Sequence, residues 1–328
     1  MLLYVEKKAK EYLLCQQICS QFPEDTIVEI QHYKNFFDKK IGDFPLEPCL
    51  ILAKQENPAI LKTPDHYGFP WESFFFKPAI NCLFECQYCY LQGTFKNRFP
   101  VIFVNIEEIQ EVIKQKIETL RHEGEKEMIT FYGSNYSDLL ALEPITHFHE
   151  SFLPFFEQFE NVRFETRTKS CNIEVFKRLK NLTSRPYYNT EIAFSLNPQE
   201  LIQSYEKKTS SLAQRISAVN ALLDLWYQVW LRFLPLLPVE DYQKIYRGFL
   251  QEIKENIDIS RVASIFIAPL LYNEDDYQKI RKKHQYPFLQ GLKLQSNGLR
   301  KMDSDFYSFF DHLFAEIFPD KEFFRDYQ

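Results

Sequence analysis

The sequence predicts an α/β protein whose main part is a sheet of parallel strands joined by helices. From about residue 71, short strand-like segments alternate with longer segments of helical periodicity, and this alternation repeats six times. The order is typical of a parallel sheet with right-handed crossovers, either as an open sheet or as a partial barrel. Three cysteines follow the first of these strands. Because functional residues in barrels collect at the carboxyl ends of strands, we predict a partial barrel.

Composition places the chain among folded proteins and limits its partners. The chain has 328 residues, of which 45% are apolar and 16% aromatic, which is enough for a large core and inconsistent with disorder. Its formal net charge is −6, so the chain has no overall attraction to nucleic acid. Binding of DNA would need a local basic patch.

The first residues lack the pattern of a signal peptide. Charges interrupt any apolar segment there, at Glu6, Lys7, Lys8, Lys10 and Glu11. No apolar run approaches the ~18 residues that span a bilayer, so we expect a cytoplasmic protein without a membrane segment. Thiols stay reduced in the cytosol, where clustered cysteines more often hold metal than form disulfides.

Residues 1–70 are predicted to form an N-terminal α/β region. Residues 5–22 have helical spacing, which puts Cys15 and Cys19 on one helix face. Two interpretations of this pair stay open: small apolar residues on a buried face, or part of a second metal site. Two short strands are expected in this region, at 26–33 and 48–54.

Residues 71–279 are predicted to form the barrel, and residues 280–328 a C-terminal extension with a hairpin and a closing helix at 304–324. The barrel strands are expected at 72–80, 127–133, 162–168, 189–197, 228–238 and 262–272. The helices between them are expected at 105–124, 144–159, 172–182, 210–226 and 240–257. Asn105 and Glu108 predict a capping pair at the start of the first helix.

The stretch NCLFECQYCY places Cys82, Cys86 and Cys89 in one loop with the spacing C-x3-C-x2-C. A zinc site normally takes four ligands, whereas a [4Fe–4S] cluster held by three thiolates keeps one iron open to a small molecule. An open iron suits S-adenosylmethionine, whose amino and carboxylate groups can chelate it before reductive cleavage. We therefore predict a [4Fe–4S] cluster, with incidental buried cysteines or a zinc site with recruited ligands as the alternatives.

The segment CLFECQYCYLQ resembles the radical S-adenosylmethionine enzymes and, within them, the spore photoproduct lyase family. Further segments similar to that family are CQYCYLQGTF, YSDLLALEPITHF, VRFETRTKS, IAFSLNP and YEKKTSSLAQRISAVNALLD. The resemblance covers roughly residues 70–270. It implies a partial (β/α)6 barrel, with the cluster and S-adenosylmethionine inside its mouth, and a radical enzyme with carbon–carbon lyase activity.

The same resemblance implies cofactor contacts at Ser137, Lys169, Ser195 and Asn197, each of which follows or ends a predicted strand. A lysine and two hydroxyl groups suit a methionine carboxylate and the polar edges of the cofactor. It also implies a reducing partner such as flavodoxin or ferredoxin.

Members of this family repair a thymine dimer in DNA, and a cysteine returns a hydrogen atom to the product radical. That donor lies two residues before the Ser-Asp pair, where this chain has Asn135. An amide is a poor hydrogen donor, so a radical enzyme with another substrate is the alternative function. Other candidate donors or catalytic residues are Cys171, Tyr88 and Tyr90.

The family holds DNA partly with a basic C-terminal hairpin, and this chain has a possible turn at Asn297-Gly298. The residues predicted to contact damaged DNA are Lys279, Arg281, Lys282, Lys283, Arg300 and Lys301. A solvated charged face is the alternative interpretation of these residues. A third function is a non-catalytic iron–sulfur or zinc protein.

Overall fold

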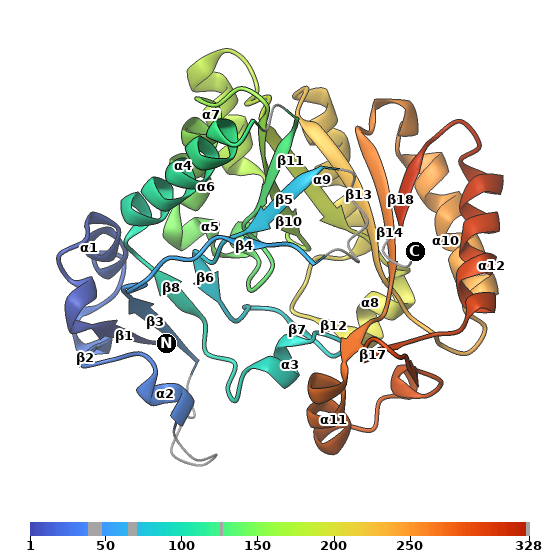
Figure 1. The fold of residues 1–328 in the computed structure, drawn as a ribbon, viewed down its shortest axis with the longest axis horizontal. Coiled ribbons are helices and arrows are strands. Elements are labelled where there is room, and N and C mark those ends of the chain that lie inside the picture. The colour runs from blue at the N-terminus through green and yellow to red at the C-terminus, as the bar shows by residue number, and fades with distance from the viewer. Residues whose placement is uncertain (39–47, 65–70, 125–126, 326–328) are drawn as a thin grey trace. The chain divides into compact units, whose positions relative to one another are not determined.

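The computed structural model describes residues 1–38, 48–64, 71–124 and 127–325, and the chain forms two compact units (Figure 1). Each unit is assembled from separate sequence ranges. Unit 1 comprises Met1–Thr63, Trp71–Leu83 and Phe95–Arg167. Unit 2 comprises Pro64–Pro70, Phe84–Thr94 and Thr168–Gln328.

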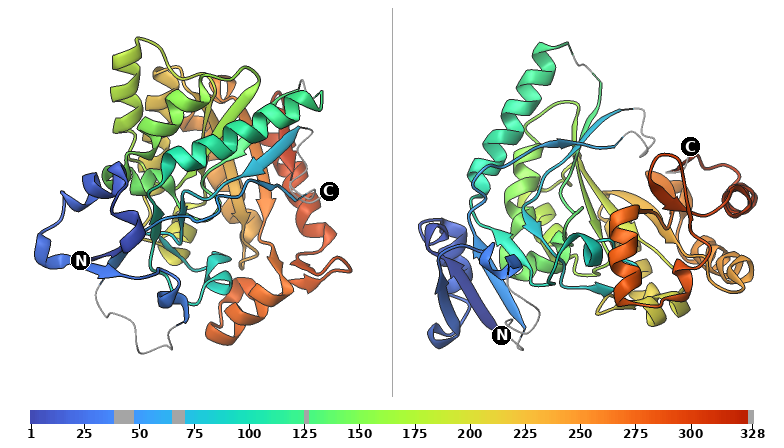
Figure 2. Two further views of the ribbon diagram at one scale, coloured as in Figure 1. Left: turned by 60° about the vertical axis from the view of Figure 1, so that its left-hand side comes forward. Right: turned by 60° about the horizontal axis from the view of Figure 1, so that its bottom comes forward.

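Unit 1 contains a five-stranded sheet whose first strands are blue in Figures 1 and 2. Its order is β2 (Ile27–Ile30), β1 (Leu2–Glu6), β3 (Cys49–Ala53), β8 (Val101–Phe103) and β6 (Ala79–Ile80). β1 is parallel to both β2 and β3, and only β6 runs antiparallel to its neighbour. The sheet therefore takes two of its strands from beyond residue 70.

The helix predicted from residue 5 is wrong in its start, because the chain first forms strand β1. Leu3 and Val5 are fully buried, which is the two-residue period of a strand. Helix α1 spans only Leu13–Cys19. Within it, the sulfur atoms of Cys15 and Cys19 lie 4.0 Å apart. Burial and the neighbouring Cys19 raise the pKa of Cys15 to about 12, which disfavours a thiolate ligand and supports the buried-face interpretation.

Unit 1 also contains four strands in the order β4 (Leu61–Lys62), β5 (Glu72–Phe75), β9 (Ile129–Tyr132) and β10 (Val162–Thr168). β5, β9 and β10 are parallel, as predicted for the first half of the barrel. Their core is aromatic: the rings of Phe156 and Phe164 stack with centroids 4.9 Å apart, and Phe76 packs on Phe152 at 5.1 Å. Such pairs add directional attraction to the burial of large apolar area.

The helices of unit 1 include α4 (Ile106–His122), α5 (Leu139–Thr146) and α6 (Phe148–Phe156). The helix predicted for 105–124 is confirmed in α4, whose apolar face buries Ile109, Ile113 and Ile117. Asn105 is the N-cap residue of α4, as predicted, but the side-chain-to-backbone hydrogen bonds of a capping pair are absent. Asn105 makes no cap hydrogen bond; it accepts one from the Gln55 amide at 2.9 Å and donates to Glu108 at 3.0 Å.

The single helix predicted for 144–159 is also wrong, because two helices meet at His147. This residue has φ of 51°, in the left-handed region, which ends α5 and begins α6. The amide of His147 still donates to the carbonyl of Glu143 at 3.0 Å. The backbone thus turns sharply at a place where side-chain periodicity continues.

Unit 2 contains four parallel strands in the order β11 (Thr190–Ser195), β13 (Gln228–Leu236), β14 (Ser264–Pro269) and β18 (Phe323–Arg325). The first three are the predicted second half of the barrel, and β18 was not predicted. Its longer helices are α7 (Glu174–Thr183), α8 (Gln199–Tyr205), α9 (Leu212–Asp224), α10 (Tyr242–Asn256), α11 (Glu274–Lys283) and α12 (Ser304–Ile317). Helix α12 ends before its predicted limit because Pro319 disfavours helical backbone at the residue before it.

The predicted hairpin lies in unit 2, after α11. Strands β16 (Lys293–Leu294) and β17 (Leu299–Lys301) are antiparallel, and β15 (Tyr272–Asn273) pairs on the other side of β17. The turn before β17 contains Gly298, whose φ of 80° suits glycine. The predicted turn at Asn297-Gly298 is therefore confirmed.

Candidate cofactor-binding site

The cysteine segment is held by backbone pairing, and its thiols are not in disulfides. Strand β7 (Glu85–Cys86) pairs with β12 (Glu206–Lys207), so Cys86 lies opposite Glu206. The amide of Cys89 donates to the carbonyl of Cys86 at 3.2 Å. None of the seven cysteines is in a disulfide, so each keeps the thiol that ligation of a metal cluster requires. Cys82 belongs to unit 1, and the other two predicted ligands belong to unit 2.

A buried glutamine and a glycine shape the backbone after Cys89. The Gln92 amide nitrogen donates to the carbonyls of Cys86 at 2.7 Å and Gln87 at 2.8 Å, which fixes the turn that carries the cysteines. In the short helix α3 (Leu91–Thr94), a Cβ on Gly93 would lie 2.7 Å from the Cα of Asp276. Only glycine allows this approach of α3 to the start of α11.

Beside this segment, Glu206 is the centre of a buried polar network in unit 2. Tyr88 donates its hydroxyl to Oε1 of Glu206, and the amide nitrogen of Asn197 donates to the same oxygen at 2.8 Å. Arg215 donates to Oε2, and both partners of this ion pair have side chains that are 0% exposed. The cysteine segment therefore meets the stretch from Asn197 to Arg215 at one carboxylate.

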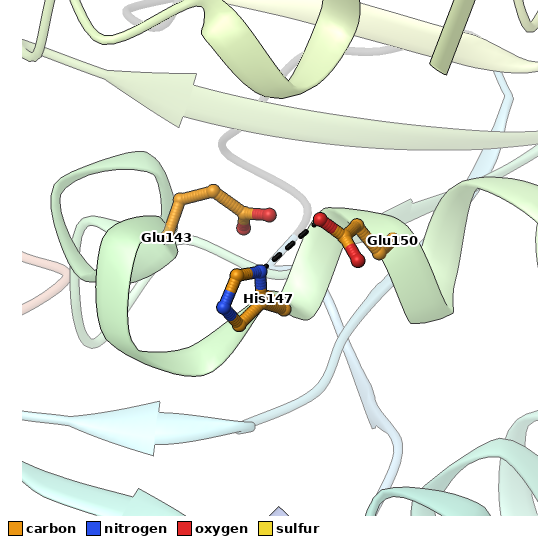
Figure 3. A group of neighbouring side chains, drawn as sticks. All are labelled: Glu143, His147 and Glu150. Carbon is orange, nitrogen blue, oxygen red and sulfur yellow. Dashed lines mark hydrogen bonds and ion pairs between the residues drawn. The ribbon is translucent and has the colours of Figure 1, made fainter. Parts of the chain in front are cut away.

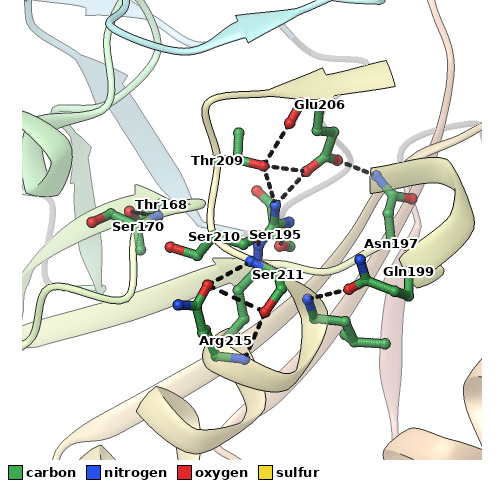
Figure 4. Close-up of polar contacts among 12 residues, drawn as sticks. Thr168, Ser170, Ser195, Asn197, Gln199, Glu206, Thr209, Ser210, Ser211 and Arg215 are labelled. Atoms are coloured by element: carbon green, nitrogen blue, oxygen red, sulfur yellow. Dashed lines mark hydrogen bonds and ion pairs between the residues drawn. The ribbon is translucent and has the colours of Figure 1, made fainter. Parts of the chain in front are cut away.

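Arg215 also fixes the ends of the neighbouring elements (Figure 4). Its guanidinium donates to the carbonyl of Ser195 at 2.8 Å, to the hydroxyl of Thr209 at 2.8 Å and to the carbonyl of Ser210 at 3.0 Å. The planar fork of arginine supports several such bonds at once. The side chain thereby joins the carboxyl end of β11 to the loop before α9.

The network changes the acidity of its members. Burial by itself would raise the pKa of Glu206, but the charges of Arg215 and Lys169 and the hydrogen bonds from Tyr88 and Asn197 outweigh it. The pKa of Glu206 is therefore lowered, and the side chain is a carboxylate. Burial, followed by the charge of Glu206, raises the pKa of Tyr88 well above its usual value, so Tyr88 keeps its proton.

Three of the predicted cofactor residues have buried polar atoms that lack partners among the described residues. In unit 2 they are the hydroxyl of Ser195 and the carbonyl oxygen Oδ1 of Asn197, on side chains that are 1% and 0% exposed. In unit 1, the hydroxyl of Ser137 is likewise buried and has no hydrogen-bond partner among the described residues. A buried polar group without a partner costs about 1–3 kcal/mol, which a bound ligand with complementary groups would offset. These residues therefore fit a polar cofactor.

Lys169 lies just beyond β10, and its ammonium is 5.7 Å from the ring centroid of Tyr88. Its carbonyl accepts from the amide of Ser210 at 3.2 Å, which positions the lysine near the loop that Arg215 holds. In unit 1, Asp138 caps α5 by accepting from the amide of Ala141 at 2.9 Å. Ser137 therefore sits directly before an ordered helix start.

The predicted catalytic residues lie in different surroundings within unit 2. The hydroxyl of Tyr88 is engaged by Glu206, whereas Tyr90 is 38% exposed. Cys171 is a partly exposed free thiol, and its amide donates to the hydroxyl of Ser210 at 3.0 Å. Their roles stay predictions.

Sequence reasoning missed Glu206 and Arg215. One signal was present: Arg215 occupies the apolar stripe of α9, between Leu212 and Val219. A charge at a buried helical position requires a buried partner.

The basic residues predicted to bind DNA lie on α11 and β17. Arg300 forms an ion pair with Glu274 at 2.6 Å, and Lys279 lies 3.7 Å from Asp276. The ammonium of Lys283 donates to the carbonyl of Gln92 at 2.9 Å, next to the cysteine turn. Arg281 and Lys282 are exposed. Part of the basic charge therefore stabilises unit 2 itself.

An α/β fold of parallel strands with a C-x3-C-x2-C triplet is typical of the radical S-adenosylmethionine enzymes. A family model described as spore photoproduct lyase matches residues 1–287. This chain belongs to the spore photoproduct lyase family.

Known relatives agree with this assignment. The chain is 23% identical to the spore photoproduct lyase of Clostridium acetobutylicum over 257 residues, which cover 77% of this chain and 73% of the relative. It is 24% identical to that of Bacillus subtilis over 266 residues, with coverages of 77% and 72%.

No helix in the described part of the chain has both the length and the apolarity needed to cross a membrane.

Solved structures show the same fold. A spore photoproduct lyase variant with bound AdoMet and dinucleoside spore photoproduct matches with a TM-score of 0.80 at 18% identity, covering 99% of this chain and 98% of that one. A spore photoproduct lyase complexed with dinucleoside spore photoproduct also gives 0.80, at 17% identity and the same coverages. The predicted partial barrel is thereby confirmed.

Proposed function

We propose that Cys82, Cys86 and Cys89 hold a [4Fe–4S] cluster with which this enzyme cleaves S-adenosylmethionine. The observation that carries the proposal is the C-x3-C-x2-C spacing of three thiols, none of them in a disulfide, within a segment that the family model matches. A cluster held by these three thiolates would supply the electron for reductive cleavage of S-adenosylmethionine into methionine and a 5′-deoxyadenosyl radical. Three thiolates leave the fourth coordination position for the cofactor.

The polar residues of the site bind the cofactor in this proposal. The positive charge of Lys169 suits the methionine carboxylate, and the hydroxyls of Ser137 and Ser195 suit its polar edges. Glu206 engages the amide nitrogen of Asn197, so Oδ1 of Asn197 points its acceptor toward a ligand N–H group. The pair of Glu206 and Arg215 thus positions a binding residue without contacting the cofactor itself.

The leading substrate is the spore photoproduct, a thymine dimer in DNA. Two of the similar solved structures hold its dinucleoside form. The exposed cations Lys279, Arg281 and Lys282 on α11, together with Lys301 on β17, are the proposed contacts to the DNA backbone. Lys283 and Arg300 belong to the same set and, like Lys279, also have protein partners. A flavodoxin-like or ferredoxin-like protein supplies electrons in this proposal.

A second candidate function keeps the radical chemistry and changes the substrate. It is favoured by Asn135, which stands where the family's hydrogen donor is expected. Cys171, Tyr88 and Tyr90 are the proposed alternative donors in unit 2. Membership of an enzyme family argues against the third alternative, a non-catalytic metal protein.

The test is anaerobic reconstitution with iron and sulfide, followed by reduction with dithionite in the presence of S-adenosylmethionine. We expect one cluster per chain and formation of 5′-deoxyadenosine, which the Cys86→Ala variant should lose. Cys49→Ala is the matched control, because that buried cysteine lies in β3 of unit 1 and has no proposed role. Full cluster iron in Cys86→Ala would contradict the assignment. Stimulation of cleavage by dimer-containing DNA distinguishes the first candidate from the second.

A further inference from the structure

A side-chain cluster at the junction of α5 and α6 in unit 1 has no part in the site described above. It consists of Glu143, His147 and Glu150 (Figure 3). One potential ligand atom from each residue lies within 4.8 Å of the other two. Nδ1 of His147 is 3.1 Å from Oε1 of Glu150.

The backbone turn explains why these residues converge. The left-handed conformation of His147 ends α5 and begins α6, while its amide remains bonded to the carbonyl of Glu143. The imidazole therefore lies over the end of α5, and the first turn of α6 brings Glu150 to it. Figure 3 shows the carboxylates of Glu143 and Glu150 facing a common space beside the imidazole.

Glu143 has one oxygen that is engaged and one that is not. Its side chain is only 4% exposed, and Oε2 accepts from the amide of His149 at 3.0 Å and faces Nδ1 of His149 at 2.6 Å. The other oxygen, Oε1, is buried and has no hydrogen-bond partner among the described residues. Burial of an unpaired carboxylate oxygen is costly, and a cation would remove that cost.

A supporting residue is also present. His149 is fully buried, and its second ring nitrogen lies 2.9 Å from the hydroxyl of Thr166. The imidazole is thus fixed from both sides and in turn fixes Glu143. Carboxylates that bind metals are commonly oriented by such a second hydrogen-bonding group.

We propose that Glu143, His147 and Glu150 bind a divalent transition-metal ion of the Zn²⁺ or Mn²⁺ class. One imidazole and two carboxylates are ligands that these ions accept. Ligand bonds of roughly 2.0–2.2 Å place neighbouring donor atoms about 3–3.5 Å apart, which matches the spacing between His147 and Glu150. Their side chains are 45% and 36% exposed, which gives the ion access and leaves positions for water.

Such an ion would fix helix α5 at its carboxyl end. The amino end of the same helix follows Ser137 directly, and Asp138 caps it. The ion would therefore clamp an element that carries a proposed cofactor residue, without touching the cofactor. Its role is structural, and no reaction is assigned to it.

The test uses the reconstituted enzyme with an oxidised, diamagnetic cluster. Mn²⁺ is titrated into the protein, and loss of the free Mn²⁺ electron paramagnetic resonance signal measures binding. Mn²⁺ prefers oxygen and nitrogen ligands, so binding to cysteine thiols should not add to the measured number of Mn²⁺ ions per chain. We expect one ion per chain, displaced by Zn²⁺, with affinity at least ~10-fold weaker in His147→Ala and in Glu150→Gln.

His122→Ala is the matched control, since that exposed histidine ends α4 in the same unit, and its affinity should equal that of the wild type. Circular dichroism checks that each variant is folded. Glu143→Gln is avoided, because that buried residue also holds His149. Equal Mn²⁺ binding by the wild type, His147→Ala and Glu150→Gln would overturn the proposal, as would absence of any bound ion in the wild type.

Discussion

At the scale of single residues, the site depends on a buried charge pair that local sequence patterns did not reveal. Glu206 receives hydrogen bonds from Tyr88, Asn197 and Arg215, and no part of the ion pair is exposed. Desolvation of two charges is expensive, so such a pair is weak evidence for stability by itself. Removal of one partner, however, leaves the other charge buried and unpaired.

We therefore expect Arg215→Met to reduce the free energy of unfolding by about 3–5 kcal/mol. Urea denaturation measures the change. The matched control is Arg261→Met, which breaks the exposed pair with Asp224 and should cost less than about 1 kcal/mol. Equal losses of unfolding free energy in the two variants would show that burial does not increase the contribution of the Glu206–Arg215 pair to stability.

The lowered pKa of Glu206 predicts a pH dependence of stability. An acid whose pKa is lower in the folded state contributes stability above its unfolded pKa, near 4.3, and loses it as pH falls through the folded value. The wild type should therefore lose stability more steeply than Glu206→Gln below about pH 4.3. Unfolding free energies measured by denaturant titration across this range test the difference. Parallel curves would contradict the assigned pKa shift.

Lys169 is expected to contribute to cofactor affinity through its charge. Lys169→Ala should weaken binding of S-adenosylmethionine by about 1.5–3 kcal/mol, the range for hydrogen bonds to charged groups. Equilibrium dialysis with the reconstituted enzyme measures this change. Lys177→Ala, at an exposed lysine of α7, should bind as the wild type does. An unchanged affinity of Lys169→Ala for S-adenosylmethionine would show that Lys169 does not bind the cofactor.

At the scale of elements, the turn that carries Cys86 and Cys89 depends on the fit between α3 and α11. The close approach occurs at Gly93, where added atoms would meet the backbone of Asp276 rather than a flexible side-chain end. The hydroxyl of Thr94 supports the same contact, because it lies 3.1 Å from the carboxylate of Asp276. The helix after the cysteines is thus fixed by a partner far away in the sequence.

We expect Gly93→Ala to destabilise the protein by about 1–3 kcal/mol, as over-packing does. The control is Gly248→Ala inside α10, where a Cβ would meet nothing within 4 Å. Because alanine favours helix more than glycine does, that variant should gain about 0.5–1 kcal/mol. Thermal unfolding distinguishes opposite signs. A stabilised Gly93→Ala would show that α3 can move away from α11 at no cost.

At the scale of the whole molecule, the fold is shared with lyases of known structure. Asn135 stands where the resemblance leads us to expect the family's hydrogen donor. Asn135 has no hydrogen that it gives up readily, so product radicals need another donor. The division into three regions, 1–70, 71–279 and 280–328, stays a prediction. The two compact units do not follow these boundaries, since each unit is assembled from separate ranges of the chain.

We expect the wild type to cleave S-adenosylmethionine with dimer-containing DNA without yielding thymine as the main product. Asn135→Cys should raise the thymine yield, because a thiol supplies the missing hydrogen atom. Asn135→Ser is the matched control, since a hydroxyl does not donate hydrogen atoms readily, and its yield should stay low. Chromatography of digested DNA measures the products. Clean return of thymine by the Cys171→Ala variant would show that the missing thiol does not matter.

The sequence by itself determined the features that depend on local pattern. The six strand–helix units, the apolar stripe of α4 and the cysteine spacing all follow from side-chain periodicity or from short-range spacing. These signals need no knowledge of distant partners, and so they could be predicted.

Only the tertiary structure decided the features that join distant segments. The pairing of β18 with β14, the hydrogen bond between Tyr88 and Glu206, and the approach of Gly93 to Asp276 each connect residues far apart along the chain. The left-handed backbone at His147, which ends α5 and begins α6, also could not be predicted, because the helical side-chain pattern continues through it. Local propensity cannot encode such features: their free energy comes from burial and pairing that exist only after the segments have met.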